Sequence, residues 1–543
     1  MNENNYPNIS VPQMETVIKK EETEGLLAGE NNTVKEILVH FEFFGIISIL
    51  YGIFYCFCLY KNTSGITMPV FTAGTFAYFI SCMKRLGISL KKDAWFYIGS
   101  ACLLGISNFL TSSQVLIFFN CVGIMLLLFG FLIHHFYEDR EWHFGKQAAS
   151  MISAFFGTIA CLHYLPKGFS YYKMKKESIS GKDSKGKYIW FGILIAIPLL
   201  MVVCALLASA DAVFRSVFQN LFQGIVLPTN LIGMAITILL GVLGSYGLLV
   251  WLSKKQLQET CSDKRTLEPL IAITFTSLLT VIYLIFSMIQ ILYLFMGNME
   301  LPSGYTYASY AREGFFQLLF VCLINLGIVL ICAERFRENM FLKIILTVFS
   351  ACTYIMIASS AMRMILYVAT YYLTFLRVLV LWTLAVLALL LTGILVSIYK
   401  ESFPLFRYCM VVVTSCYLIF SLAKPDYFIA KYNLCKAIGA YRQMPADMVS
   451  DPYEDGYLDE NYLFYHLSFD AVPAMEEVGL FNQTGDWLIH EDKLKNYSNR
   501  LKYETENMGI RTFNFSKYRA KKAAKNISEQ LEIKQSGMEC FEG

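Results

Sequence analysis

The stretch Tyr188–Asp211, YIWFGILIAIPLLMVVCALLASAD, constrains the fold most strongly, because it runs for twenty-three residues without a charge before it reaches an aspartate. An α-helix rises 1.5 Å per residue, so about 20 apolar residues cross the ~30 Å hydrocarbon core of a bilayer. The stretch therefore predicts a transmembrane helix. The lysines that precede it, among them Lys182, Lys185 and Lys187, predict that its first end faces the cytoplasm.

The composition of the whole chain agrees with this prediction. Of its 543 residues, 56% are hydrophobic and only 16% are charged, whereas a soluble domain has about 25% charged residues. The lipid bilayer is therefore the expected partner. A net charge of +3 gives no indication of a nucleic-acid partner.

Further apolar runs predict ten more spans, at residues 43–60, 68–83, 95–110, 115–134, 231–251, 270–296, 315–332, 341–369, 374–399 and 408–423. The expected fold is an all-α, polytopic transmembrane helical bundle of about eleven spans, with a small soluble helical C-terminal domain. The segment Ala148–Leu165 is short and polar for a span. We expect it to lie in the membrane interface, with a spanning helix as the alternative.

The positions of Lys and Arg predict the orientation of the chain. With alternating spans, the loops on one side hold 22 basic residues and those on the other hold five, and the richer side is expected to be cytoplasmic. This predicts a multi-pass protein of the cell (cytoplasmic) membrane with a cytoplasmic N-terminus and an extracytoplasmic C-terminus. The expected parts are a disordered tail (1–36), N-terminal membrane helices with an interfacial segment and a basic loop (37–187), the main bundle (188–423) and the outer domain (424–543).

Residues 424–543 are too many for a simple tail. Residues 443–492 carry acids and no Lys or Arg, and residues 493–525 are mainly basic, which predicts a domain whose two halves face each other. Apolar residues recur at helical spacing at Tyr462, Leu463, Tyr465 and Leu467 and at Val472, Ala474, Met475 and Val478. Whether Cys435 and Cys540 pair stays open.

Five charges fall on the external half of the predicted bundle: Asp211, Arg312, Glu313, Arg363 and Arg377. An arginine within the membrane costs at least ~2.5–3.5 kcal/mol on insertion scales, so Arg363 needs a partner or access to water. We expect an ion-paired cluster of these five residues. It is either a structural clasp between helices or a binding site for a ligand or an ion.

No catalytic motif, nucleotide fingerprint, cofactor site or metal-ligand spacing is evident. His134, His135, His143 and His163 lie near Glu138, Asp139 and Glu141, but they do not match a zinc pattern. We expect them to anchor the chain at the interface. Gly241, Gly244 and Gly247 predict the close approach of another helix.

Four segments resemble a family of bacterial multi-pass membrane proteins, the domain-of-unknown-function family numbered forty-one seventy-three. They are LLASADAVF (206–214), YTYASYAREGFFQL (305–318), SSAMRMILYVATYYLTFLR (359–377) and YLFYHLSFDAVPAM (462–475). The resemblance implies a bacterial cytoplasmic membrane and a recurrent Asp/Arg pattern at these positions. It carries no established reaction and therefore no active site.

These features favour an integral membrane protein that is not an enzyme, either an envelope-facing scaffold or a sensor-like component whose outer domain contacts an extracytoplasmic partner. The alternatives are a transporter of a small or ionic solute and a membrane-embedded enzyme that acts on a lipid-linked substrate. Charges on one side of the bundle and the lack of an internal repeat speak against transport. The oligomeric state stays open.

Overall fold

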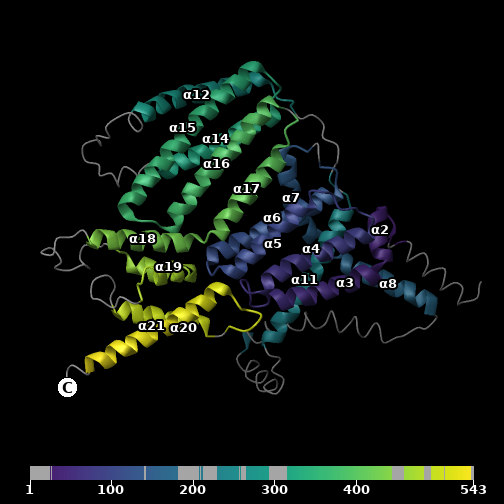
Figure 1. Cartoon of the computed structure of the whole chain (residues 1–543). Coiled ribbons are helices and arrows are strands. Elements are labelled where there is room, and N and C mark those ends of the chain that lie inside the picture. The colour runs from purple at the N-terminus through teal and green to yellow at the C-terminus, as the bar shows by residue number, and fades with distance from the viewer. Residues whose placement is uncertain are drawn as a thin grey trace, which may run out of the picture. The chain divides into compact units, whose positions relative to one another are not determined.

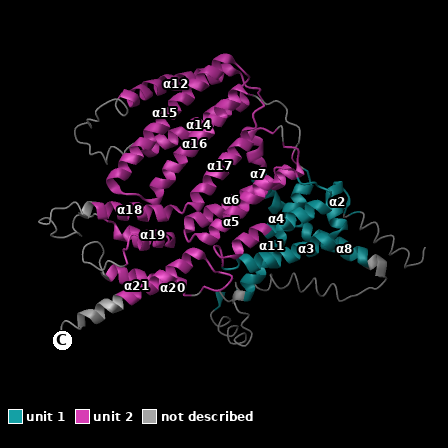
Figure 2. Ribbon diagram, viewed as in Figure 1, with its two compact units in different colours: residues 1–61, 74–90, 152–256 teal, residues 62–73, 91–151, 257–543 magenta. Residues whose placement is uncertain are grey.

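The structure is a computed structural model, and it describes residues 25, 27–139, 142–180, 207, 210–211, 229–255, 257, 265–292, 315–400, 402–442, 458–481, 491–506 and 508–539. Most of Tyr188–Asp211 lies outside these residues, as do Arg312 and Glu313. The described chain falls into two compact units: residues 1–61, 74–90 and 152–256 in unit 1, and 62–73, 91–151 and 257–543 in unit 2 (Figure 2).

The described residues form helices and no strand, as the all-α prediction requires; Leu267 and Phe336 make one isolated bridge. The α-helices before the C-terminal region are α2 (Asn32–Val39), α3 (Phe41–Leu59), α4 (Thr67–Arg85), α5 (Ala94–Leu110), α6 (Gln114–Phe136), α7 (Phe144–Ala160), α8 (Tyr164–Ser180), α11 (Thr229–Ser253), α12 (Pro269–Gln290), α14 (Phe315–Arg335), α15 (Met340–Tyr371), α16 (Phe375–Tyr399) and α17 (Leu405–Leu422). Helix α2 begins within the expected disordered tail, so the boundary of any such tail lies before Asn32.

Eight of the described helices are long and apolar enough to cross a membrane: α3, α6, α11, α12, α14, α15, α16 and α17. Each coincides with a span predicted from the sequence. The predicted spans at 68–83 and 95–110 are also helices, α4 and α5. Helix α5 is apolar but shorter than the eight candidate spans. The chain is therefore an α-helical multi-pass membrane protein.

In unit 1, α3 and α11 pack against each other in opposite directions. Asn31, just before α2, donates to the carbonyl of Ser253 at one end of the pair, and Cys56 donates to the carbonyl of Met234 at the other. A Cβ atom on Gly241 would come within 3.0 Å of the backbone of Gly52. The close helix approach predicted for the glycines of α11 is thus present at Gly241.

The ambiguous segment Ala148–Leu165 spans the break between α7 and α8, which are bent by 50°. Together the two helices are long and apolar enough to count as one broken span. However, Tyr164 and Lys167 both bind Glu30, and Gly157 packs on Trp251. All three contacts lie at the Ser253 end of the α3–α11 pair, which supports the interfacial interpretation.

In unit 2, helices α12, α14, α15 and α16 lie side by side, and α17 joins α16 to α5 and α6 (Figure 1). Two apolar cores fill the first group. One is built around Leu346, Phe349 and Ile394, and the other around Met356, Met364 and Leu384. The bundle is therefore packed by large side chains at two levels along its helices.

The C-terminal region follows as α18 (Pro425–Arg442), the π-turn η3 (Tyr462–His466), the 3-10 turn η4 (Phe469–Ala471), α19 (Val472–Glu477), α20 (Glu491–Thr505) and α21 (Phe515–Glu539). It has its own apolar core, to which Leu463, Leu467, Val472, Ala474 and Met475 contribute as their spacing predicts. The prediction that Tyr465 belongs to this apolar face is wrong, because Tyr465 is 45% exposed. Lys493 Nζ lies 2.9 Å from Glu460 Oε2, which joins the basic half to the acidic half.

Loops that are far apart in the sequence meet this region at one end of unit 2. Asn433 on α18 binds both the N–H and the carbonyl of Leu373, between α15 and α16. Asn514 binds the carbonyls of Ser64 and Thr111. These loops were all placed on one side of the membrane by the alternation of spans, so their common position agrees with the predicted order.

Candidate functional site

The structure places three of the five predicted site residues. Asp211 belongs to unit 1, where it is exposed and its N–H donates to the carbonyl of Leu207 at 2.9 Å. Arg363 and Arg377 belong to unit 2, and Arg312 and Glu313 lie outside the described residues. The five-residue cluster therefore stays a prediction.

Arg363 lies on α15 with only 8% of its surface exposed. One of its terminal nitrogens donates to Gln290 Oε1 at 3.4 Å, and the Ser359 hydroxyl donates to the same oxygen at 2.6 Å. Gln290 ends α12, so this contact joins two spans. The sequence argument predicted that Arg363 needs a partner, but it considered only acids and missed this amide.

Arg377 lies at the start of α16 and reaches back to the end of α15. Its guanidinium donates to the carbonyls of Tyr371 and Tyr372 and stacks over the ring of Tyr367 at 4.2 Å. The last carbonyls of a helix have no partner within the helix, and a cation there also favours the helix dipole. Arg377 thus caps α15, which is a structural role.

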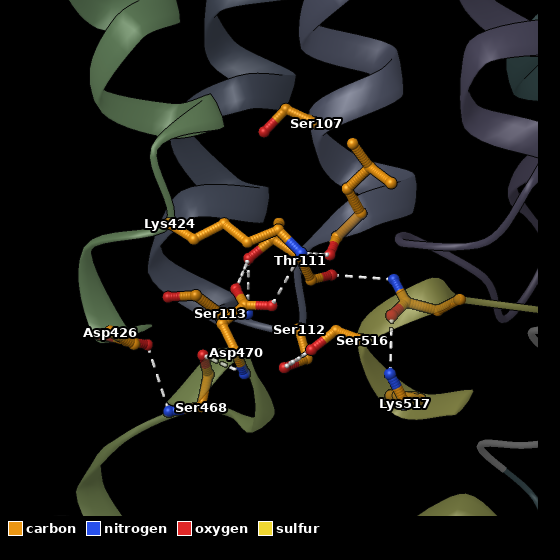
Figure 3. Close-up of polar contacts among 12 residues, drawn as sticks. Ser107, Thr111, Ser112, Ser113, Lys424, Asp426, Ser468, Asp470, Ser516 and Lys517 are labelled. Carbon is orange, nitrogen blue, oxygen red and sulfur yellow. Dashed lines mark hydrogen bonds and ion pairs between the residues drawn. The ribbon is translucent and has the colours of Figure 1, made fainter. Parts of the chain in front are cut away.

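A second polar cluster was not predicted as a site. It lies where the α5–α6 loop and the α17–α18 connection meet the C-terminal region, and Figure 3 shows its side chains converging from these segments. We call it the loop junction and define it as Thr111, Lys424, Asp426, Ser468, Asp470, Asn514 and Ser516.

Asp470 is the most deeply buried acid of the loop junction, with 2% of its surface exposed. The Thr111 hydroxyl donates to its Oδ2, and Lys424 Nζ lies 3.8 Å from its Oδ1. The same ammonium donates to the carbonyl of Leu110 at 2.8 Å. Burial lowers the pKa of Lys424 and the charge of Asp470 opposes this effect, so the pair is coupled in a dry site.

Asp426 is the second buried acid, with 4% of its surface exposed. It accepts the N–H of Ser468 at 3.2 Å, and the Ser468 hydroxyl accepts the N–H of Asp470 at 3.3 Å. Burial raises the pKa of Asp426 to about 6, and the nearby charge of Asp470 acts in the same direction. Asp426 therefore takes up a proton more readily than an exposed aspartate does.

Asn514, just before α21, binds backbone carbonyls of two segments. Its amide nitrogen donates to the carbonyls of Ser64 at 2.7 Å, Asn108 at 3.2 Å and Thr111 at 2.8 Å. Asn514 itself is fully buried. Unpaired buried carbonyls are costly, so this side chain stabilises the ends of α5 and of the loop before α4.

The hydrogen bonds continue from the loop junction into the bundle. The Asn108 carboxamide oxygen accepts from Asn120 at 2.9 Å, and Asn120 Oδ1 accepts from Tyr417 at 2.8 Å and from Ser421 at 2.8 Å. Ser107 and Ser421 are joined at 2.6 Å. Polar side chains between membrane helices act as specific contacts, since lipid offers them no partner. The network thus ties α5, α6 and α17 to the C-terminal region.

A cavity of about 330 Å³ lies beside the loop junction, and we call it the junction cavity. Its wall includes Ser113 and Gln114 from α6, Asp426 from α18, His466 from η3, Arg500 from α20 and Lys517 from α21. Arg500 donates to Glu504 at 2.8 Å and to the carbonyl of Phe464 at 2.6 Å, so its positive charge is held in place. The cavity therefore has fixed charges of both signs.

The predicted interfacial histidines have different surroundings. His134 and His135 at the end of α6 are buried, and His134 Nδ1 lies 2.8 Å from Asp139 Oδ1. His135 accepts the N–H of Lys91 through Nε2 at 3.1 Å. Among the described residues, no group of three or more His, Cys, Asp or Glu side chains could hold a metal ion. These two histidines serve to connect α6 with the segments around it.

The apolar helices, the packed bundle and the C-terminal helical core together define a polytopic α-helical membrane protein. The chain belongs to the family described as Domain of unknown function (DUF4153), whose model matches residues 98–478. The expected class of family, multi-pass proteins without an assigned function, is confirmed, and its number is 4153 in place of the one inferred from the motifs. No curated protein and no solved structure matches the chain.

Proposed function

We propose that this protein is a non-enzymatic, sensor-like component of the cell membrane, with its C-terminal region on the envelope side. The observation that carries the proposal is the direct hydrogen-bond connection between that region and the membrane helices. Asn514 and Asp470 from the C-terminal region bind the α5–α6 loop, and Asn108 and Asn120 extend the connection into the bundle.

Such a connection suits a sensor because it converts a local event into a rearrangement of helices. Most contacts of the loop junction are hydrogen bonds between small polar groups. A change at Asp426 or Asp470 reaches α6 through Thr111 and reaches α17 through Lys424. A ligand or a proton that favours one arrangement would shift the population of bundle states by its difference in affinity.

A scaffold needs the same connection but does not need to move. A reversible disulfide that holds the α5–α6 loop against α21 therefore distinguishes a sensor from a scaffold. Ser112 Oγ and Ser516 Oγ lie 3.1 Å apart, which places the two residues within reach of a disulfide. We suggest the double variant Ser112→Cys/Ser516→Cys with Cys435→Ser and Cys540→Ser in the background. Bond formation is checked by non-reducing electrophoresis and peptide mass spectrometry.

The lock is tested in a deletion strain whose growth and uptake defects have first been profiled. If the protein is a sensor, the oxidised double variant fails to complement the strain, and reduction restores complementation. The single variants Ser112→Cys and Ser516→Cys serve as controls and should complement under both conditions. Full complementation by the oxidised form would exclude the sensor and leave the scaffold.

The envelope-side position of the C-terminal region has its own test. The loops at residues 111–113, 372–374 and 423–424 share one end of unit 2 with that region, so a single reporter fixes the side for all of them. We expect a reporter fused after Lys424 to show periplasmic or extracellular activity. Cytoplasmic activity there would invert the orientation of the bundle.

A further inference from the structure

The junction cavity has an unusual wall at the start of α6. Ser113 is the N-cap residue of this 23-residue helix, yet its side chain makes no capping hydrogen bond. An N-cap serine normally accepts an N–H from the first turn of its helix. The first N–H groups of a helix have no partner within the helix, so the first turn of α6 presents unused donors at the cavity wall.

The Ser113 hydroxyl is a second, independent indication of a ligand. Only 5% of Ser113 is exposed, the residue lines the cavity, and no hydrogen bond joins its hydroxyl to another described residue (Figure 3). The hydroxyl is therefore available to a ligand that enters the cavity.

The electrostatics of the cavity determine the sign of that partner. Lys517 lines it, and no hydrogen bond or ion pair joins its ammonium to a described side chain, while Arg500 on another wall is paired with Glu504. The positive end of the α6 dipole points the same way. The opposing charge comes from Asp426, since Glu504 and Arg500 neutralise each other.

We propose that the junction cavity binds a phosphoryl oxyanion, held by the first turn of α6, the Ser113 hydroxyl and the Lys517 ammonium. A tetrahedral oxyanion suits donors that arrive from several directions, and helix N-termini are common sites for phosphate groups. Lys binds phosphate as a point charge. The group belongs either to a free phosphate compound or to the headgroup of a phospholipid, because the cavity lies at the end of membrane helices.

This assignment deepens the sensor proposal by naming the class of ligand, since the anion would bridge α6 and the C-terminal helix α21. It rests on the proposed function only for its biological meaning. Binding itself can be measured without the deletion strain or the disulfide lock. If phosphate does not bind, the proposed ligand is rejected. If the disulfide-locked variant complements the deletion strain fully, the sensor function is rejected.

The first arm of the test measures binding of inorganic phosphate to the purified full-length protein in detergent by equilibrium dialysis. We expect one saturable site per chain, with affinity reduced about tenfold in Lys517→Met and several-fold in Ser113→Ala, as for the loss of a hydrogen bond to a charged group. Lys521→Met, an exposed lysine one turn further along α21, is the matched control and should bind as the wild type does.

The second arm uses vesicles of phosphatidylglycerol and native mass spectrometry to count retained lipids. Retention of one lipid by the wild type and by Lys521→Met, with loss in Lys517→Met, would assign the phosphoryl group to a headgroup. Saturable phosphate binding without lipid retention would assign it to a free compound. No saturable binding in either arm would overturn the proposal.

The Asp426→Asn variant tests the sign of the ligand charge. At a fixed pH of about 7.5 it removes a negative charge from the cavity wall, so we expect it to tighten phosphate binding several-fold. Weaker binding in this variant would contradict an anionic ligand. Lys517 is half-buried at the cavity edge, so Lys517→Met is expected to fold, and the test does not depend on Ser113→Ala being stable.

Discussion

Lys424 and Asp470 form an ion pair at 3.8 Å between the end of the last membrane helix and the turn that begins α19. Asp470 is nearly inaccessible, and the Lys424 side chain is 24% exposed. Removing one member of a buried pair leaves the other charge without compensation, which is more costly than the pair is favourable. The pair therefore contributes to the attachment of the C-terminal region, together with Asn433 and Asn514.

The substitution Asp470→Ala tests this pair. It is expected to lower the free energy of detachment of the C-terminal region by about 3 kcal/mol, since Lys424 and Thr111 both lose a partner. The measurement is the rate of limited proteolysis within α20 and α21 at several protease concentrations. Lys431→Met, which breaks an exposed pair with Glu477, should leave that rate almost unchanged. Equal rates in both variants would contradict the role of Asp470.

Acidification should strengthen the attachment through Asp426. Its pKa is about 6 in the folded protein against an ordinary value of 3.8, so the folded state binds the proton more tightly. The stabilisation is present at low pH, falls as the pH rises from about 4 to about 6, and is lost above that range, with a total of about 3 kcal/mol.

Protection of α20 and α21 from proteolysis at a pH of about 4.5 and about 7.5 measures this effect. The charged groups around Asp426 are Lys424, Asp470, His466, Arg500, Glu504 and Lys517. The comparison with Asp426→Asn isolates the buried acid. An unchanged pH dependence in Asp426→Asn would assign the effect to other groups.

Asn514→Ala removes three hydrogen bonds to loop carbonyls and should destabilise the loop junction by about 3 kcal/mol. Hydrogen exchange of the amides near residues 64–67 and 108–113 is the appropriate measurement, because local opening accelerates it. Asn526→Ala on the exposed face of α21 is the control. Equal exchange in the two variants would show that Asn514 does not hold the loops.

Gln290→Leu removes the amide that binds Arg363 at 3.4 Å. A polar contact between membrane helices contributes about 1 kcal/mol, so thermal unfolding in detergent should shift to a lower temperature. Gln290→Glu retains an acceptor for Arg363 and for Ser359, and it should restore most of the stability. A neutral effect of Gln290→Leu would mean that other groups satisfy Arg363.

The predicted cluster of Asp211 with the arginines can be tested by a double-mutant cycle of Asp211→Asn and Arg363→Gln. Residues in contact show interaction energies of about 0.5–3 kcal/mol, whereas distant residues are additive within about 0.5 kcal/mol. We expect a measurable coupling in thermal unfolding. Additive effects would contradict the predicted contact between Asp211 and Arg363. A folded Asp211→Asn variant that behaves like the deletion strain would favour a functional site over a clasp.

The membrane helices were predictable because each one satisfies its own backbone and exposes its own apolar run. Helices α12, α14, α15 and α16 therefore fall where hydropathy places them. The loop junction was not predictable in the same way. Thr111 and Asp470 are 359 residues apart in sequence, and no local sequence pattern around either residue predicts the contact.

Some signals of the junction were nevertheless present. Asp470 lies within the motif YLFYHLSFDAVPAM that carried the family resemblance, and Asn108 and Asn120 interrupt apolar runs. A polar side chain within a membrane helix indicates a contact with another helix. The arginines are conspicuous in the sequence because they carry charge, but Arg377 caps a helix and Arg363 binds Gln290, which no local pattern marks as its partner.

The position of Asn514 has a consequence for the synthesis of the chain. It lies 450 residues after Ser64, and translation at about 5–20 residues per second separates the two by roughly 20–90 s. Throughout that interval the carbonyls of the early loops lack their final donor, although the first helices are already inserted. A chain that stops short of Asn514 would leave the end of α5 and the loop before α4 without this donor, however well the membrane helices themselves had formed.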